Sequence, residues 1–160
     1  MNTMETYIDV LLTSLKKKEE ALKKLDRVVE KENDILKSAD AGIEELNELQ
    51  QQKEDLLAEI DELEIGFEKV YERAGTELSK ERQKYRSQIE QMQTYIKSVT
   101  DLTVKIRAQG ERNRQYMEAF IRSKKREIKQ YHVGNQRMAQ YHQHTADPVM
   151  GQSYFLNRKK

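Results

Sequence analysis

Apolar residues recur at every seventh position along the first part of the chain, with polar residues between them. The repeat runs through Ile8, Leu15, Leu22, Val29 and Leu36, and a parallel set that includes Leu11 and Leu25 occupies the alternate positions. A heptad of this kind is typical of an α-helix that packs along another helix. The pattern predicts a helix from about residue 4 to about residue 38.

A short break follows, and then a second apolar stripe begins. The break is Ala39-Asp40-Ala41-Gly42, which combines small residues with a glycine that tolerates a tight turn. The second stripe, on a helix expected over residues 42–73, consists of Leu46, Leu49, Leu56, Ile60, Leu63, Phe67 and Val70. Folding back across the turn gives a helical hairpin that pairs Leu36 with Leu46, Leu15 with Phe67 and Leu11 with Val70. Glu32 and Lys53 interrupt the two stripes about one helical turn apart across the seam, where they could form an ion pair that fixes the register.

A weaker break at Ala74-Gly75-Thr76 leaves two interpretations open. A turn there predicts a third helix over residues 76–109 that returns along the hairpin, with Ile96 beside Leu56 and Ile106 beside Leu46. The alternative is one helix that continues straight through Gly75 with a four-residue shift in the repeat. We favour the turn, because a straight helix would leave its second half without a partner and forfeit the packing that stabilises amphipathic helices. The predicted body is thus a three-helix bundle over residues 1–110.

The next stretch is still amphipathic, but the expected bundle has no room for it. Residues 111–133 lie between Gly110 and Gly134 and gather apolar side chains on one face: Tyr116, Met117, Phe120, Ile121, Ile128 and Tyr131. An apolar face without a partner indicates a binding site. Met117, Phe120, Ile121 and Ile128 are the predicted contacts for another protein. The alternative is that this helix folds back on the bundle or pairs with its copy in a homodimer. Residues 134–160 are expected to form a mobile tail.

Composition narrows the class of protein. Asp, Glu, Lys and Arg make up 36% of the 160 residues, and hydrophobic residues only 36%, which suits slender helices better than a layered globule. No run of apolar residues is long enough for a membrane span, and the absence of cysteine fits a reducing cytoplasm. Residues 1–80 carry 12 basic and 21 acidic side chains (net −9), and residues 81–160 carry 17 and 7 (net +10). Oppositely charged helices lying side by side account for this asymmetry, and a basic arm for an acidic partner is the alternative.

The sequence gives little support for nucleic-acid binding, metal binding or catalysis. The basic stretch 122–129 could contact nucleic acid, but it is short and contains Glu127. His132, His142 and His144 lack the neighbouring carboxylates of a metal site. Catalysis needs a rigid pocket with paired titratable groups, which slender helices do not supply. We therefore expect no enzyme, no metal or cofactor and no nucleic acid partner.

The stretch from Glu30 to Glu64 resembles the flagellar export chaperones of the FlgN type. The resemblance rests on a Glu-rich end of the first helix, a small turn with an acidic residue, closely spaced leucines, a lysine, a leucine pair and a closing Leu-Glu. Here these are Glu30 and Glu32, Asp40, Leu46 and Leu49, Lys53, Leu56 and Leu57, and Leu63-Glu64.

The resemblance implies a cytoplasmic, all-α chaperone. Such proteins hold hook–filament junction proteins unassembled and deliver them to the flagellar type III export apparatus, its export gate and ATPase complex. It implies client binding by the C-terminal part and docking on the export gate through a tyrosine, for which Tyr116 is the first candidate and Tyr131 the second. The expected fold is an elongated antiparallel helical hairpin or three-helix coiled-coil bundle with an added C-terminal amphipathic helix and flexible tail. The rival interpretation is a self-associating coiled-coil spacer without a client.

Overall fold

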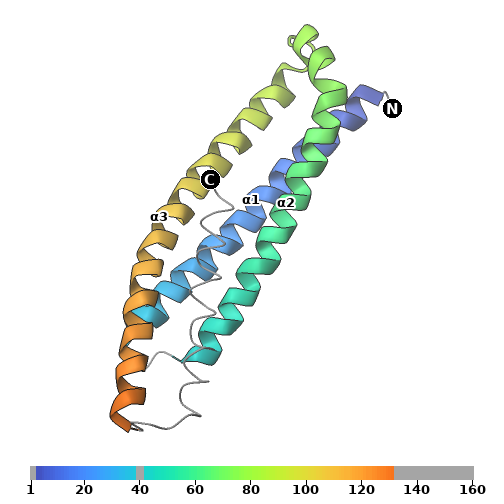
Figure 1. Ribbon diagram of the computed structural model, residues 1–160. Helices are drawn as coiled ribbons and strands as arrows, with labels where there is room; N and C mark the ends of the chain where they lie inside the picture. The colour runs from blue at the N-terminus through green and yellow to red at the C-terminus, as the bar shows by residue number, and fades with distance from the viewer. Residues whose placement is uncertain (1–2, 39–41, 132–160) are drawn as a thin grey trace. The chain divides into compact units, whose positions relative to one another are not determined.

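Three long helices make up the part of the chain that the structure describes. The computed structural model describes residues 3–38 and 42–131, and α1 spans Thr3–Lys37, α2 Ile43–Lys80 and α3 Arg86–Tyr131 (Figure 1). No strand occurs within these ranges, so the all-α, three-helix prediction is confirmed. None of the helices in the described ranges has a stretch both long and apolar enough to cross a bilayer. The expected mobile tail, 134–160, lies outside the described residues.

The hairpin turn between α1 and α2 lies where the small residues predicted it. α1 ends at Lys37, and the amide of Ser38 donates to the Ile35 carbonyl over 3.0 Å. The Gly42 carbonyl then accepts from the Leu46 amide over 3.3 Å as α2 begins. Glu44 and Glu45 lie in the first turn of α2, where a carboxylate is favoured by the helix dipole.

The second turn lies later than predicted. α2 runs through Gly75 to Lys80, and residues 81–85 form the connection, with hydrogen bonds from the Glu81 amide to the Glu77 carbonyl (3.0 Å) and from the Tyr85 amide to the Glu81 carbonyl (3.3 Å). The predicted helix ends at 73 and 76 are therefore wrong. The straight-helix alternative is right about Gly75 but wrong about the residues beyond Lys80, because the chain turns there.

Packing explains why the small residues at 74 and 75 do not break the helix. Ala74 is fully buried in an apolar cluster, and Gly75 is buried with the ring of Tyr71 so close that a Cβ would lie 3.1 Å from it. Glycine weakens a helix interior by about 1 kcal/mol relative to alanine, a cost that the surrounding contacts override. Ala74 and Gly75 thus lie on the buried face of α2, where the helix continues.

The same correction applies at Gly110. α3 continues through it without interruption, so the predicted helix end at 109 is wrong and residues 111–131 extend the third helix. The buried residues of α3 keep helical spacing across this point: Ile106, Gly110, Asn113, Met117 and Ile121. A glycine on the buried face of a long helix again marks packing.

The chain forms two compact units, and each helix contributes to both. Of the described residues, unit 1 comprises residues 3–26 and 54–104, and unit 2 comprises residues 27–38, 42–53 and 105–131. The units thus cut across the helices, whereas the sequence suggested a division along the chain at residue 110.

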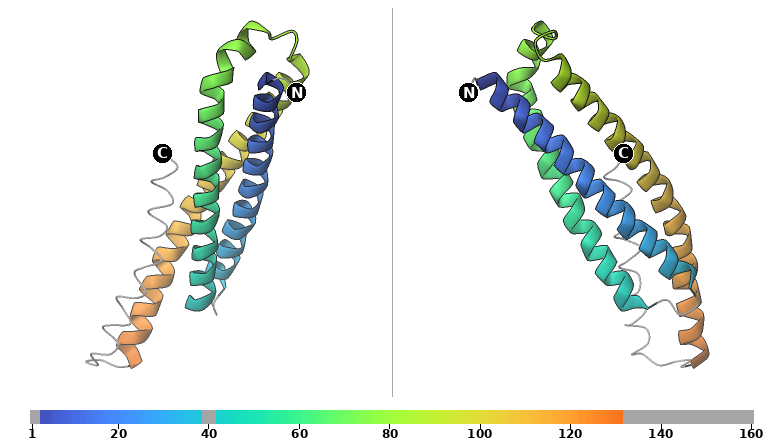
Figure 2. Two further views of the ribbon diagram at one scale, coloured as in Figure 1. Left: turned by 90° about the vertical axis from the view of Figure 1, so that its right-hand side faces the viewer. Right: turned by 180° about the vertical axis from the view of Figure 1, so that it is seen from behind.

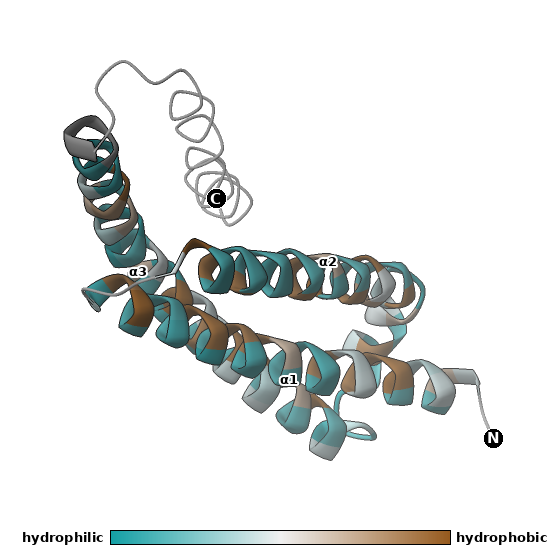
Figure 3. Ribbon diagram, turned by 90° about the horizontal axis from the view of Figure 1, so that it is seen from below, coloured by the Kyte–Doolittle hydropathy of each residue, from teal (hydrophilic) through white to brown (hydrophobic). Residues whose placement is uncertain are grey.

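Unit 1 has an apolar core drawn from all three helices. The cluster contains Met4, Ile8, Leu11, Leu15, Ala74, Leu78, Tyr85 and Met92. Phe67 and Val70 pack against it, as the hairpin pairing with Leu15 and Leu11 predicted. Figure 2 shows α1, α2 and α3 from two further sides, and Figure 3 shows hydrophobic and hydrophilic residues alternating along each helix, which is the pattern of helices with one buried stripe.

Candidate functional site

Unit 2 holds most of the residues that the sequence singles out for binding. One apolar cluster of unit 2 consists of Leu36 from α1, Leu46 from α2, and Met117 and Ile121 from α3. Ile35 and Phe120 are partly buried against this cluster. Met117 is 1% exposed and Ile121 7%, so these two predicted contact residues belong to the chain's own core.

The expectation that this face of the helix has no partner inside the chain is therefore wrong for Met117 and Ile121. The physical reason is the position of the second turn. With a turn at Gly75, Leu46 would lie beside Ile106. Because α2 continues to Lys80, the pairing shifts along α3, and Leu46 instead packs with Met117 and Ile121.

Next to this apolar cluster lies a buried polar network that joins all three helices. The Lys53 ammonium on α2 lies 2.8 Å from the Glu32 carboxylate on α1, and both side chains are only 1% exposed. The sequence predicted this ion pair. A buried charge is costly unless it is paired and hydrogen-bonded, so the network fixes how the helices of unit 2 fit together.

Asn113 completes the network from α3. Its fully buried amide nitrogen donates to the Glu32 carboxylate (3.0 Å) and to the Val29 carbonyl (2.8 Å). Its amide oxygen accepts from Asn33 and from Gln109, each over 2.9 Å. Both N–H groups of the Asn113 amide thus donate and both lone pairs of its oxygen accept, which is the full hydrogen-bonding capacity of the side chain.

Sequence reasoning missed Asn113, although a signal for it existed. The apolar spacing of α3 runs through Ile106, Met117 and Ile121, and Asn113 falls on the same face. A polar residue at such a position usually specifies register or partner. The helix end expected at Gly110 hid that continuity.

Two aromatic residues of α3 remain accessible in unit 2. Tyr116 is 39% exposed, and the Lys37 ammonium lies 5.6 Å from its ring centroid. Phe120 is partly buried, with the Lys124 ammonium 5.6 Å from its ring centroid. Ile128 and Tyr131 lie within α3, but their side chains are outside the part of the chain that the structure describes.

The end of α3 extends past the hairpin turn of unit 2. Figures 1 and 2 show the last turns of α3 continuing beyond the first turn of α2. Arg122, Lys125 and Arg126 are exposed on this stretch. The Arg114 guanidinium lies 2.7 Å from the carboxylates of both Glu111, one turn earlier on α3, and Glu118, one turn later. Its hydrogen bond with Glu111 raises the pKa of the guanidinium and lowers the pKa of the Glu111 carboxyl. The surface here is an aromatic pair flanked by charge, with positive charge prevailing toward the end.

Within residues 3–38 and 42–131 no group of three or more potential ligands is placed to hold a metal ion. His132, His142 and His144 lie outside these ranges. Toward its end in unit 2, α3 presents exposed aromatic and basic side chains, and the buried polar network holds this helix on the hairpin. Such an arrangement can bind a protein helix.

Comparison with known proteins assigns the chain to a family. No curated protein and no solved structure matches it. A family model described as FlgN protein matches residues 1–144. That match covers most of the chain, including the hairpin, the polar network and the end of α3, and so the protein belongs to the FlgN family, whose general role is that of a flagellar export chaperone.

Proposed function

We propose that this protein binds hook–filament junction proteins in the cytoplasm, keeps them unassembled, and delivers them to the flagellar type III export apparatus. The observation that supports this most directly is the end of α3. It extends beyond the hairpin turn. Just before this extension, beside the end of α1, α3 presents Tyr116 and Phe120 with cations around them.

The proposed client surface has two kinds of residue. Met117 and Ile121 hold α3 on the hairpin through Leu36 and Leu46. Phe120, which is only partly buried, contacts the client, and Ile128, seven residues after Ile121, continues the contact. An apolar client helix that packs here would bury the surface through which it otherwise assembles. Arg122, Lys125 and Arg126 would speed association with an acidic client more than they tighten it.

Tyr116 is the proposed docking residue for the export gate and its ATPase complex, with Tyr131 as the second candidate. Tyr116 combines an accessible ring with a polar tip, the type of side chain that anchors protein interfaces. Because Tyr116 lies four residues before Phe120, client binding and gate docking would occur close together on α3.

The rival spacer interpretation needed one continuous helix from Gly42 onward. The turn at residues 81–85 ends α2 and removes that premise. Self-association as a homodimer stays a prediction, which sedimentation velocity of the free protein would test.

The deciding experiment is calorimetric titration of the full chain with purified hook–filament junction proteins. We expect one-to-one binding, weakened at least about tenfold by Phe120→Asp, because a buried charge at an interface is strongly unfavourable. Ala119→Asp is the matched control, since Ala119 is exposed on the adjacent position of α3. Equal loss in both variants, or no binding by a folded wild-type chain, would overturn the proposal.

Point substitutions are preferable to truncation in this test. Ending the chain after Gln109 would delete Met117 and Ile121 from the apolar cluster and Asn113 from the buried polar network. Lost binding by such a fragment would report unfolding as well as a missing contact.

A further inference from the structure

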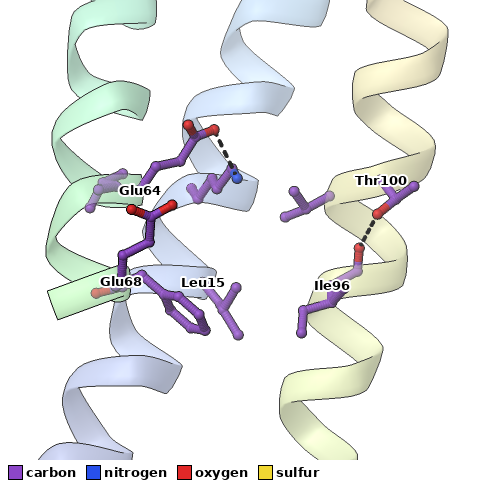
Figure 4. A pocket seen from close by; sticks show the side chains of 10 residues that line it. Leu15, Glu64, Glu68, Ile96 and Thr100 are labelled. Atoms are coloured by element: carbon purple, nitrogen blue, oxygen red, sulfur yellow. Dashed lines mark hydrogen bonds and ion pairs between the residues drawn. The ribbon is translucent and has the colours of Figure 1, made fainter. Parts of the chain in front are cut away.

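Unit 1 contains an open cleft that the proposed client site does not use. It has a volume of about 360 Å³ and is lined by all three helices. Leu63 and Phe67 of α2 form one wall, Ile96 and Thr100 of α3 form the other, and Leu15 of α1 lies between them. Figure 4 shows Glu64 and Glu68 of α2 across from Ile96 and Thr100 of α3.

Small as well as large side chains line the cleft. Ser14 and Thr100 line it. The sequence predicts Ile96 beside Leu56 in the core, but Ile96 is 46% exposed and lines the cleft instead. A β-branched apolar residue so exposed inside a concave surface indicates a site that another apolar group can cover.

The walls have the geometry that receives a helix. Leu63 and Phe67 are four residues apart on α2, and Ile96 and Thr100 are four apart on α3, so each wall is a ridge along one helix face. Side chains at i, i+3 or i+4 intervals on a helix of another protein fit between two such ridges. The Thr100 hydroxyl already donates to the Ile96 carbonyl over 2.8 Å, so an apolar occupant would leave it satisfied.

Charge indicates which helix the cleft would accept. Between Glu54 and Lys80, α2 carries nine acidic and three basic residues. At the cleft itself, Glu64 is paired with Lys18 over 3.0 Å, and Glu68 lies on the rim. A partner with Lys or Arg along the edge that faces α2 would therefore be favoured over one with Asp or Glu.

We propose that this cleft is a second protein-binding site, separate from the end of α3, and that it accepts one amphipathic α-helix of a partner protein. The helix places an apolar stripe between α2 and α3 and a row of basic residues against Glu64 and Glu68. The site lies wholly within unit 1 and does not depend on client binding by unit 2.

The test uses the full chain and two stapled helical peptides of about 18 residues, long enough to stay helical. Both carry leucine at i, i+4 and i+7 spacing, and one has lysine and the other glutamate along the same edge. Fluorescence anisotropy at about 0.15 M salt should show saturable one-to-one micromolar binding of the lysine peptide and at least about tenfold weaker binding of its glutamate twin. No saturable binding, or equal binding of the two, would overturn the proposal.

Two variants locate the site. Ile96→Glu should weaken the lysine peptide at least about tenfold, because it places a charge on the apolar wall. Ile65→Glu is the matched control: Ile65 is 54% exposed on α2 but does not line the cleft, so affinity should be unchanged. Equal loss in both variants would mean that the peptide binds elsewhere, against the proposal.

A charge swap keeps the test decisive if Ile96→Glu should fail to fold, which its melting curve would reveal. Glu68→Lys, on the rim of the cleft, should weaken the lysine peptide and strengthen the glutamate peptide. Unchanged preference would overturn the proposal. Phe120→Asp should leave peptide binding unaltered, which separates this site from the proposed client surface.

Discussion

The Glu32 carboxylate and the Lys53 ammonium lie 2.8 Å apart, with each side chain only 1% exposed. Glu32 belongs to α1 and Lys53 to α2, and the other carboxylate oxygen of Glu32 accepts from Asn113 of α3. Unit 2 thus contains a buried charge pair that α1 and α2 form and to which Asn113 of α3 donates a hydrogen bond. Such a pair adds little net stability compared with apolar residues, but losing one partner strands a charge in the core.

Lys53→Met should therefore destabilise the protein by about 3–5 kcal/mol, because it leaves the Glu32 carboxylate buried without its counterion. Urea unfolding at neutral pH measures this as a lower midpoint. Lys105→Met is the matched control, since Lys105 pairs with Glu30 on the surface, with the two side chains 59% and 53% exposed. An exposed pair contributes at most about 1 kcal/mol.

A second substitution shows whether the stranded charge is the cause. Adding Glu32→Gln to Lys53→Met removes that charge and keeps an acceptor for Asn113, so part of the loss should be recovered. If the double variant were less stable than Lys53→Met alone, stranded charge would be the wrong explanation.

Asn113→Ala should cost about 1–3 kcal/mol, because it leaves buried groups on Val29, Glu32 and Asn33 without their shared partner. Gln115→Ala, at an exposed position of the same helix, should change stability by no more than about 0.5 kcal/mol. Equal effects from the two substitutions, measured by thermal or urea unfolding, would mean that the network does not hold α3.

The heptads of the first 70 residues predicted the hairpin and its ion pair because regular spacing leaves few ways to bury two stripes. Leu36 with Leu46, and Glu32 with Lys53, lie together as that spacing requires. The third helix was harder to place. Its register depends on one turn, and the residues at 81–85 carry no glycine or proline to mark it.

Gly75 and Gly110 misled the prediction for a shared reason. Glycine serves equally for a turn and for close packing in a helix, and only the neighbouring side chains decide between them. Tyr71 is the relevant neighbour at Gly75, and the buried stripe of α3 continues through Gly110. The shifted register then moved Met117 and Ile121 into the core and left Ile96 on the cleft, which spacing alone could not reveal.

Glu19 should titrate below its ordinary range. The Ser98 hydroxyl donates to its carboxylate and lowers its pKa, Lys23 adds to this, and partial burial opposes it. Because the folded pKa lies below the unfolded value, the contact stabilises the protein above the unfolded pKa. That stabilisation is lost as the pH falls through the folded pKa.

Ser98→Ala should accordingly raise the pKa of Glu19 toward its ordinary value, which NMR titration of the side-chain carboxyl measures directly. The fall in stability on acidification should become shallower in the variant. Thr94→Ala is a suitable control, because the Thr94 hydroxyl donates to the carbonyl of Glu90 within its own helix. A Glu19 pKa that does not move would show that Ser98 is not the main cause.

Gly75→Ala separates packing from turn geometry at the position that the sequence left ambiguous. Inside a helix, alanine is favoured over glycine by about 1 kcal/mol, whereas at a turn with positive φ it would be strained. The added Cβ would meet the Tyr71 ring at 3.1 Å, and that ring is 48% exposed, so it can move aside. We expect a small net stabilisation.

Gly66→Ala, where no atom lies within 4 Å of the new Cβ, should give the full gain of about 1 kcal/mol. In a Tyr71→Leu background, the Gly75 substitution should approach the Gly66 value, because the ring that limits it is gone. Thermal unfolding of the four variants measures all of this, and a destabilised Gly75→Ala in both backgrounds would restore the turn at residue 75.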